Sequence, residues 1–314
     1  MDPQQARSAL ARGARALCSP AGVRGTAVEA TWVTAHLLTY PFGIAAEKAR
    51  RTPESFSLQQ LPPVQRGLLH GDVEAAGTPI LLVHGLVDNR SIFTLLCRSL
   101  RRRGFGRVTT YNYRPWTTDL RAAARKLGEQ VEAICEHSGY ERIHVIGHSM
   151  GGILARHYVQ RQGGDARVHT LVTLGSPHGG TGAARLLPFG VTAQLTPTSA
   201  VIEELRQPAP DCRTRFVAFW SDLDGLITPK RSARIEHPDL AARNIFVRGA
   251  GHMSLPIDRR VVRDIVMTLA HLQSDGSTAA VGATLIGSTS ERRTPPVQPV
   301  PAHPAAAAER SAEL

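Results

Sequence analysis

The chain has 314 residues, of which 42% are hydrophobic and 20% charged, a composition that suits one sizeable α/β domain with extra segments at its ends. The formal net charge is +11, but no basic stripe interleaved with aromatic side chains and no nucleic-acid-binding motif appears, so a nucleic-acid partner is not expected. The four cysteines have no C-x-x-C spacing, which argues against a zinc site.

Residues 1–63 are predicted to be an N-terminal extension. Within it, residues 27–46 are the most apolar stretch, but Glu29 interrupts them and Pro41 would break a helix. The stretch is too short and mixed for a membrane span and is typical of an amphipathic helix packed on the domain. The alternative is a peripheral membrane contact or a cover over an acyl-binding site.

Residues 1–24 lack the continuous apolar core of a signal peptide. We therefore expect a cytoplasmic or peripheral membrane location, with secretion as an alternative. At the other end, residues 274–314 are rich in Ala, Pro, Ser and Thr. This composition predicts a disordered tail, because the segment cannot bury enough apolar surface to order itself.

Residues 64–273 are predicted to form one compact domain, in which strand-like and helix-like patterns alternate. In chain order we expect a strand at 79–83, a helix from about 91, a strand at 107–113, a helix at 119–137, a strand at 142–146, a helix at 150–161, strands at 168–174, 215–220 and 244–248, and a helix at 258–272. This alternation favours an α/β fold with a mostly parallel central sheet and helices on both faces. Ligands bind such sheets at the carboxyl ends of the strands, so functional residues should follow strands.

The candidate nucleophile follows the third strand. Residues 147–151 read Gly-His-Ser-Met-Gly and fit the motif G-x-S-x-G between a strand and a helix. In this motif the serine, here Ser149, occupies a sharp, strained turn that exposes its oxygen above the sheet. The helix that begins after it favours developing negative charge.

The same motif predicts an oxyanion hole made of two backbone N–H groups. One belongs to Met150, which follows the serine. The other comes from the loop after the first strand, which reads His84-Gly85-Leu86, and we assign it to Leu86. We interpret His84 as a hydrogen-bonded loop histidine. His84, Gly85 and His148 are also grouped with the residues expected on the substrate-binding side.

The candidate base is His252, which follows the last strand and is the last histidine before the final helix. The chain order serine, acid, histidine is that of α/β-hydrolases. His252 would take the proton of Ser149 and return it to the leaving group. Two aspartates, Asp222 and Asp224, follow the strand at 215–220 and compete for the role of the acid. Because no Glu stands at the spacing of a calcium loop, no metal is expected.

These segments together resemble bacterial triacylglycerol lipases and esterases of the α/β-hydrolase fold, especially the small members with almost no lid. The resemblance covers roughly residues 78–272 and rests on residues 84–86, 147–152, 173–181, 224–227 and 251–252. It favours Asp224 over Asp222, because the Gly-Leu-Ile-Thr-Pro that follows Asp224 resembles the family's segment after its acid.

The resemblance also implies where the substrate binds. Pro177 and His178 belong to the most lipase-like stretch and are expected on the substrate-binding side. The region 180–211 is short, so a large lid is not expected. Leu187 and Phe189 are candidates for a small flap or acyl wall, and an ordinary packed loop is equally compatible with this sequence.

The sequence thus predicts a serine hydrolase without a cofactor that cleaves small-molecule or lipid esters with an apolar acyl chain through an acyl-serine intermediate. A dehalogenase or epoxide hydrolase would have aspartate in place of Ser149. Three alternatives remain: an acyl thioesterase, an acyltransferase, and, from a different class, a non-catalytic binding protein that retains the pocket. Fold alone does not decide among them.

Overall fold

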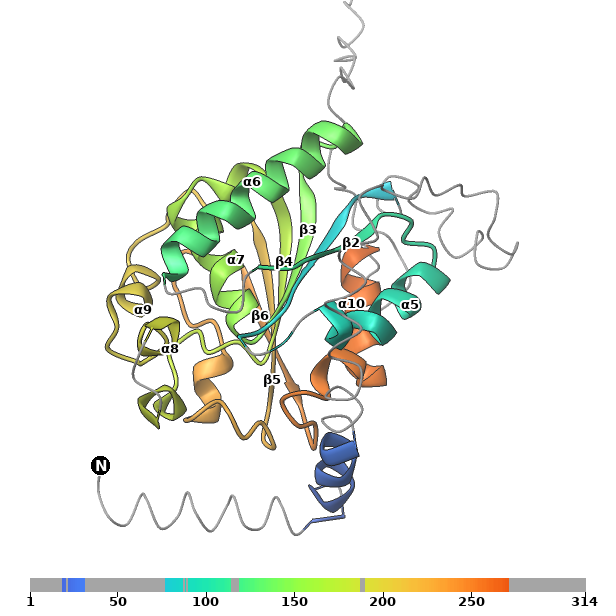
Figure 1. Ribbon diagram of the computed structural model, residues 1–314, viewed down its shortest axis with the longest axis vertical. Helices are drawn as coiled ribbons and strands as arrows, with labels where there is room; N and C mark the ends of the chain where they lie inside the picture. The colour runs from blue at the N-terminus through green and yellow to red at the C-terminus, as the bar shows by residue number, and fades with distance from the viewer. Residues whose placement is uncertain are drawn as a thin grey trace, which may run out of the picture.

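The architecture is a single parallel sheet with helices on both faces (Figure 1). The computed structural model describes residues 19–20, 22–31, 77–86, 88, 90–113, 119–186 and 190–270. Within these residues the sheet has six strands in the order β2-β1-β3-β4-β5-β6, and every neighbouring pair is parallel. The predicted fold class is therefore confirmed.

The strands are β1 (Ile80–Val83), β2 (Val108–Tyr111), β3 (Ile143–His148), β4 (Val168–Leu174), β5 (Arg215–Ser221) and β6 (Ala242–Val247). The three strands β1, β3 and β4 are buried at every position, as expected of parallel strands covered on both faces. Their carboxyl ends lie at one edge of the sheet, which is the edge where ligands bind in this architecture.

The helices are α5 (Thr94–Arg102), α6 (Leu120–Ser138), α7 (Met150–Arg161), α8 (Gly190–Ala193), α9 (Ala200–Glu204) and α10 (Arg259–Leu269). Short 3₁₀ segments are η2 (Arg90–Phe93), η3 (Gly164–Ala166), η4 (Gly182–Leu186), η5 (Lys230–Ala233) and η6 (Leu255–Ile257). In Figure 1, α6, α7, α8 and α9 lie on one side of the sheet, and α5 and α10 lie on the other.

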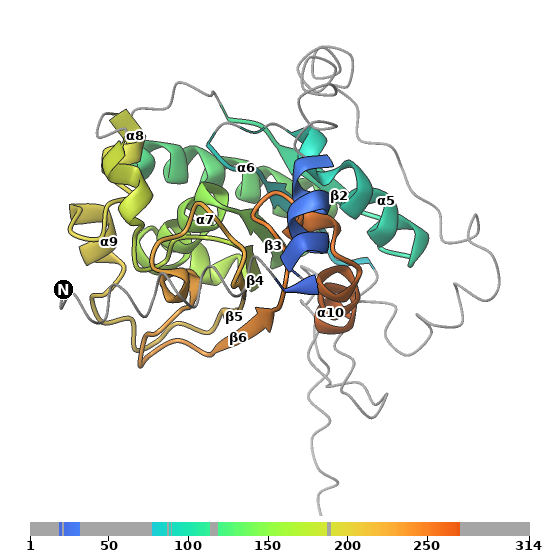
Figure 2. The same cartoon turned by 90° about the horizontal axis from the view of Figure 1, so that it is seen from below.

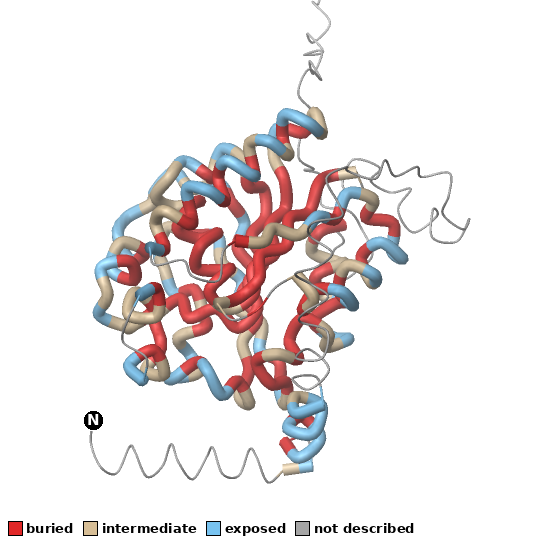
Figure 3. Tube along the Cα trace, viewed as in Figure 1, coloured by how far each residue is buried: buried red, intermediate tan, exposed pale blue. Residues whose placement is uncertain are grey.

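Two hydrophobic cores result, one on each face of the sheet (Figure 3). Alternate residues of β1 separate into them: Leu81 and Val83 pack with α6 and α7, whereas Ile80 and Leu82 pack with α5 and α10. This separation follows from the two-residue period of a strand. The sheet is thereby fixed between two apolar layers, and the loops at its carboxyl edge start from rigid strand ends.

The element boundaries agree closely with the predicted ones. Residues 150–161 and 168–174 have the predicted bounds, and Asp119 caps α6 by accepting the N–H of Arg121 at 2.9 Å. The last strand begins at Ala242 and not at 244, because its first two residues pair with Phe216 and Val217 on β5, although the first is only partly buried and the second is exposed. An edge strand of this kind has no continuous apolar run that would reveal its start.

A further helix, residues 22–31, lies outside these layers and is called the N-terminal helix below. Figure 2 shows it in blue against the loop that leads into α10. Only the first part of the predicted apolar stretch 27–46 belongs to it, and residues 32–46 lie outside the described residues, as do Leu187, Phe189 and the predicted tail. No helix in the described part of the chain is long and apolar enough to cross a bilayer.

Candidate active site

The three residues predicted to form a catalytic triad follow three different strands of the sheet. Ser149 comes directly after β3, Asp224 follows β5, and His252 follows β6. All three therefore lie at the carboxyl edge of the sheet, and the structure brings Asp224 and His252 into direct contact.

Ser149 occupies a strained turn. Its φ of 52° and ψ of −123° make it the one non-glycine residue with positive φ among the described residues. Such a conformation costs about 1–3 kcal/mol and persists only where the surroundings impose it. Here the N–H of Ser149 donates to the carbonyl of Leu174 at 2.9 Å. A Cβ on Gly151 would lie 2.2 Å from the carbonyl oxygen of Val83, so this close approach of helix and strand requires glycine.

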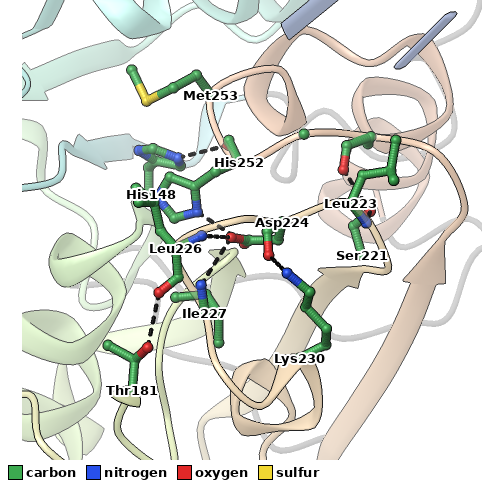
Figure 4. Close-up of polar contacts among 12 residues, drawn as sticks. His148, Thr181, Ser221, Leu223, Asp224, Leu226, Ile227, Lys230, His252 and Met253 are labelled. Carbon is green, nitrogen blue, oxygen red and sulfur yellow. Dashed lines mark hydrogen bonds and ion pairs between the residues drawn. The ribbon is translucent and has the colours of Figure 1, made fainter. Parts of the chain in front are cut away.

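His252 and Asp224 form a buried pair (Figure 4). The Nδ1 of His252 lies 2.8 Å from Oδ2 of Asp224. The other oxygen of Asp224 accepts the N–H groups of Leu226 at 3.0 Å and Ile227 at 3.1 Å. Lys230 donates to the backbone carbonyl of Asp224. The carboxylate is thus held from several sides and in turn fixes the imidazole ring.

The electrostatics of this pair suit proton transfer. Burial alone would raise the pKa of Asp224, but the attraction of His252 and the hydrogen bonds that Asp224 accepts outweigh it, so the pKa lies below its ordinary value. Burial alone would lower the pKa of His252, but the charge and hydrogen bond of Asp224 outweigh it, so this pKa is raised. His252 is therefore a stronger base than an isolated imidazole.

The second candidate acid, Asp222, has a different position. Its Oδ1 accepts the N–H of Gly249 at 2.7 Å and lies 3.3 Å from the hydroxyl of Ser221, which donates to it. Asp222 therefore connects the loop after β5 to the loop that carries His252. The geometry favours Asp224 as the partner of His252, as predicted.

A second histidine–aspartate pair lies beside the first. The Nδ1 of His148 is 3.1 Å from Oδ2 of Asp88, and its Nε2 is 3.1 Å from the backbone oxygen of His252. The centroids of the His148 and His252 rings are 4.7 Å apart. Since His148 directly precedes Ser149, this contact brings the segments of the predicted nucleophile and base together.

The prediction of His148 as a substrate-binding residue gains no support from its position. Its side chain is fully buried, and both ring nitrogens have partners within the fold. Asp88 was not recognised in the sequence, because it lies in a loop from which only a backbone N–H was expected.

The loop of the predicted oxyanion hole reaches Ser149. A Cβ on Gly85 would lie 3.1 Å from Cβ of Ser149, so Gly85 brings its backbone close to the nucleophile. The hydroxyl of Tyr113 lies 2.8 Å from the carbonyl oxygens of both His84 and Gly85 and donates to them. Met150 begins α7, and its N–H and that of Leu86 remain the predicted oxyanion donors.

His84 supports this loop from within. Its ring stacks on Tyr113 with 4.3 Å between centroids, and the residue is buried. These contacts, with the 2.8 Å between its Nδ1 and the carbonyl oxygen of Gly85, agree with a hydrogen-bonded loop histidine, and its grouping with the substrate-binding residues gains no support from this position. The role of Tyr113 could not be predicted, because nothing in the sequence indicates that its hydroxyl reaches a loop 28 residues away.

The residues predicted after β4 are also internal. Pro177 is buried, and Nε2 of His178 lies 2.9 Å from the hydroxyl of Thr173. Burial and the nearby Arg156 lower the pKa of His178 far below its ordinary value. This loop folds its histidine back onto the sheet, so the prediction of His178 as a substrate-binding residue gains no support from its position.

A cavity of about 330 Å³ adjoins His252. It lies between the N-terminal helix and the loops after β5 and β6, and its lining residues are Gly25, Thr26, Glu29, Leu223, Gly225, Leu226, Gly251, His252 and Met253. Among the described residues, the cavity included, no cluster of three or more His, Cys, Asp or Glu side chains is placed to hold a metal ion.

Comparisons with known proteins bear on the fold. Residues 79–208, less than half of the chain, match the family model of palmitoyl protein thioesterase. The mature Bacillus licheniformis lipase BlEst2 is 18% identical, with a TM-score of 0.53 over 62% of this chain and 92% of that chain. Aspergillus fumigatus lipase B is 13% identical, with a TM-score of 0.55 over 71% of this chain and 63% of that chain.

The chain has the α/β-hydrolase fold. The resemblance to lipases and esterases drawn from the sequence is thereby confirmed at the level of the fold. The matched family segment includes the loop at residues 84–86 and Ser149, and it ends before Asp224 and His252.

Proposed function

We propose that the protein is a serine hydrolase that cleaves carboxylic acyl esters through an acyl-serine intermediate. The observation that carries the proposal is the strained turn at Ser149, at the same sheet edge as the buried pair of His252 and Asp224. A serine in such a turn has its hydroxyl oxygen exposed above the sheet, where it can reach a substrate, and a histidine held by a carboxylate accepts the proton of that hydroxyl.

In the first half of the reaction, Oγ of Ser149 attacks the carbonyl carbon of the ester while its proton passes to Nε2 of His252. The carbonyl oxygen becomes an oxyanion, which the N–H groups of Leu86 and Met150 would bind. One such donor contributes about 2.7–4 kcal/mol to lowering the barrier. His252 then gives its proton to the leaving alcohol, and the carbon–oxygen bond breaks.

In the second half, water attacks the acyl-serine and His252 again accepts the proton. The oxyanion forms a second time and collapses, the bond between the acyl carbon and Oγ breaks, and His252 returns its proton to Oγ, which releases the acid and restores the hydroxyl of Ser149. Throughout, Asp224 keeps the proton on Nδ1 of His252, so that Nε2 stays available to accept. No cofactor takes part in this proposal.

A second candidate is hydrolysis of acyl thioesters, favoured by the match of residues 79–208 to the palmitoyl protein thioesterase model. The same residues serve both reactions. The difference is that a thiol is a much stronger acid than an alcohol, so a thiolate leaves with little help from a proton donor. Thioester cleavage therefore depends less on the acid role of His252.

Paired substrates with one acyl chain, joined once to an alcohol and once to the corresponding thiol, separate the two candidates. We expect turnover of the oxygen ester at short, medium or long chain length and its loss in Ser149→Ala. A preference for the thioester beyond the ratio of alkaline hydrolysis rates would favour the second candidate. Turnover that survives in Ser149→Ala, or none on either series, contradicts the proposal.

A further inference from the structure

The N-terminal helix contacts the loop of the candidate base directly. The carboxylate of Glu29 accepts the N–H of Met253 at 2.6 Å and the N–H of Ser254 at 2.8 Å. These two residues immediately follow His252. The helix therefore binds the chain at the point where the base is attached, although more than 220 residues separate the two segments in sequence.

The docking of the helix is close, and small residues make it possible. A Cβ on Gly251 would lie 2.3 Å from the carboxyl group of Glu29, and a Cβ on Gly25 would lie 2.1 Å from the carbonyl oxygen of Gly249. A side chain at position 25 would require a shift of backbone, and one at position 251 would displace the carboxyl group of Glu29. The contact is thus a fitted one, on both the helix and the loop.

Glu29 completes a set of contacts that fixes His252 at Nδ1 of its ring, at its backbone oxygen and at the two peptide groups that follow. Asp224 holds its Nδ1, His148 holds its backbone oxygen, and Glu29 holds the two peptide groups that follow. Hydrogen bonds from N–H groups to a carboxylate are short and about twice as strong as neutral ones. Without Glu29, the peptide groups after His252 would lose both of these bonds, and the loop would be held only on the Asp224 and His148 sides and, before His252, by Asp222 and Ser221.

The charge of Glu29 acts on the base as well. Three carboxylates surround His252, namely Asp224, Asp88 and Glu29, and each raises its pKa against the lowering effect of burial. His148 adjoins the same ring, and Lys230 donates to the backbone carbonyl of Asp224. Removing the charge of Glu29 should therefore lower the pKa of His252 but leave Asp224 as its main determinant.

We propose that Glu29 is a positioning residue for His252, and that the N-terminal helix is an integral part of the active site. The inference rests on the proposed function, since it assigns His252 the role of the base. It adds that a segment outside the sheet and its covering helices sets the geometry of that base.

The test compares Glu29→Gln and Glu29→Ala in the full chain with Glu203→Gln, a matched control. Glu203 lies on α9 and pairs with Arg206 at the surface, away from the site. We expect kcat/KM on the ester substrate to fall by up to about 100-fold in Glu29→Ala, mainly through kcat, because small displacements of a catalytic group are costly. The Gln variant retains an acceptor oxygen and should lose less.

The pH profile separates positioning from mere stabilisation. In Glu29→Gln the acid limb of kcat/KM should move to lower pH, because the negative charge beside His252 is gone. The Glu203→Gln control should keep the wild-type profile. Wild-type kcat/KM and pH profile in both Glu29 variants would overturn the inference. So would a fall in melting temperature and rate in Glu29→Ala with an unmoved acid limb in Glu29→Gln.

Labelling of Ser149 by a fluorophosphonate distinguishes this inference from the proposed function. The reagent reports on activation of the serine by its base and does not require the natural substrate. If the wild-type protein is neither labelled nor active, the proposed function fails. If it is labelled and active but both Glu29 variants are labelled at the wild-type rate, the positioning role alone fails.

Discussion

Two histidine–aspartate pairs lie side by side at the carboxyl edge of the sheet, and the main difference between them is whether Nε2 of the histidine has a hydrogen-bond partner. In both pairs Nδ1 of a buried ring faces an aspartate, at 2.8 Å for His252 with Asp224 and at 3.1 Å for His148 with Asp88. The Nε2 of His148 contacts the backbone oxygen of His252. The Nε2 of His252 has no hydrogen bond within the described part of the chain.

The difference teaches that the second ring nitrogen decides what a buried histidine does. A ring with partners at both nitrogens is fixed and serves as structure. A ring with a partner only at Nδ1 is oriented but still has Nε2 available for a reacting proton. His148 thus supports the loop that carries His252.

The largest effect should come from exchanging each histidine for glutamine. His252→Gln should lower kcat/KM about 10⁶-fold, because the base of a serine–histidine–carboxylate unit is lost. His148→Gln should cost at most about 100-fold, because it disturbs only the position of His252. Ester hydrolysis by both variants, with thermal melting as the check on folding, measures the contrast. Equal losses would refute the distinction between the two pairs.

The two aspartates after β5 should differ almost as much. Asp224→Asn should lower kcat by about 10⁴-fold, because the amide no longer keeps the proton on Nδ1 of His252. Asp222→Asn retains an acceptor for Gly249 and, with one hydrogen bond weakened by about 1 kcal/mol, should lose less than about tenfold. A larger loss in Asp222→Asn than in Asp224→Asn would reverse the assignment of the acid.

A smaller effect is expected from the acid of the second pair. Asp88→Ala leaves the buried Nδ1 of His148 without this partner, which should cost about 1–3 kcal/mol of folding stability. Activity should fall only about tenfold, through the indirect displacement of His252. Asp88→Asn restores an acceptor oxygen and should recover most of both. Chemical denaturation and steady-state kinetics on the same samples test this, and a loss as deep as that of Asp224→Asn would contradict it.

The smallest effect is a displacement of the pH profile. His252 must be neutral to accept the proton of Ser149, so activity falls as the pH drops through its pKa. Because that pKa is raised, the midpoint of the acid limb of kcat/KM should lie above about 6.5, the ordinary value for histidine. An acid limb centred below that value would mean that the carboxylates do not act on His252 as the geometry indicates.

The sheet, and the placement of the three candidate catalytic residues at one edge of it, could be predicted from the sequence, because each of these residues follows a strand that an apolar run reveals. Ser149 and His252 needed only the motif, the chain order and that topology, whereas the choice of Asp224 over Asp222 also needed the resemblance to the family's segment after its acid. The contacts of the His148 and His178 rings could not be predicted in the same way. Sequence position locates a backbone near the site but does not say which partner its side chain meets.

The supporting residues could not be predicted. Asp88, Tyr113 and Glu29 act by bonding a side chain to a loop or ring elsewhere in the chain, at separations from 28 to 225 residues. Such contacts leave no periodicity or motif in a single sequence. Glu29 was noticed only as a charge that interrupts an apolar stretch, and its partners are backbone groups that have no sequence signature of their own.

The contact between Glu29 and the loop after β6 also has a consequence for biosynthesis. A ribosome makes residues 22–31 before any strand of the sheet, and it makes Met253 and Ser254 after the last one. The N-terminal helix therefore cannot dock until the ribosome has made all six strands of the sheet and the loop after β6. Under the positioning role proposed for Glu29, His252 reaches its final geometry only when both ends of the fold have met, and a nascent chain that already contains Ser149 should not yet hydrolyse esters.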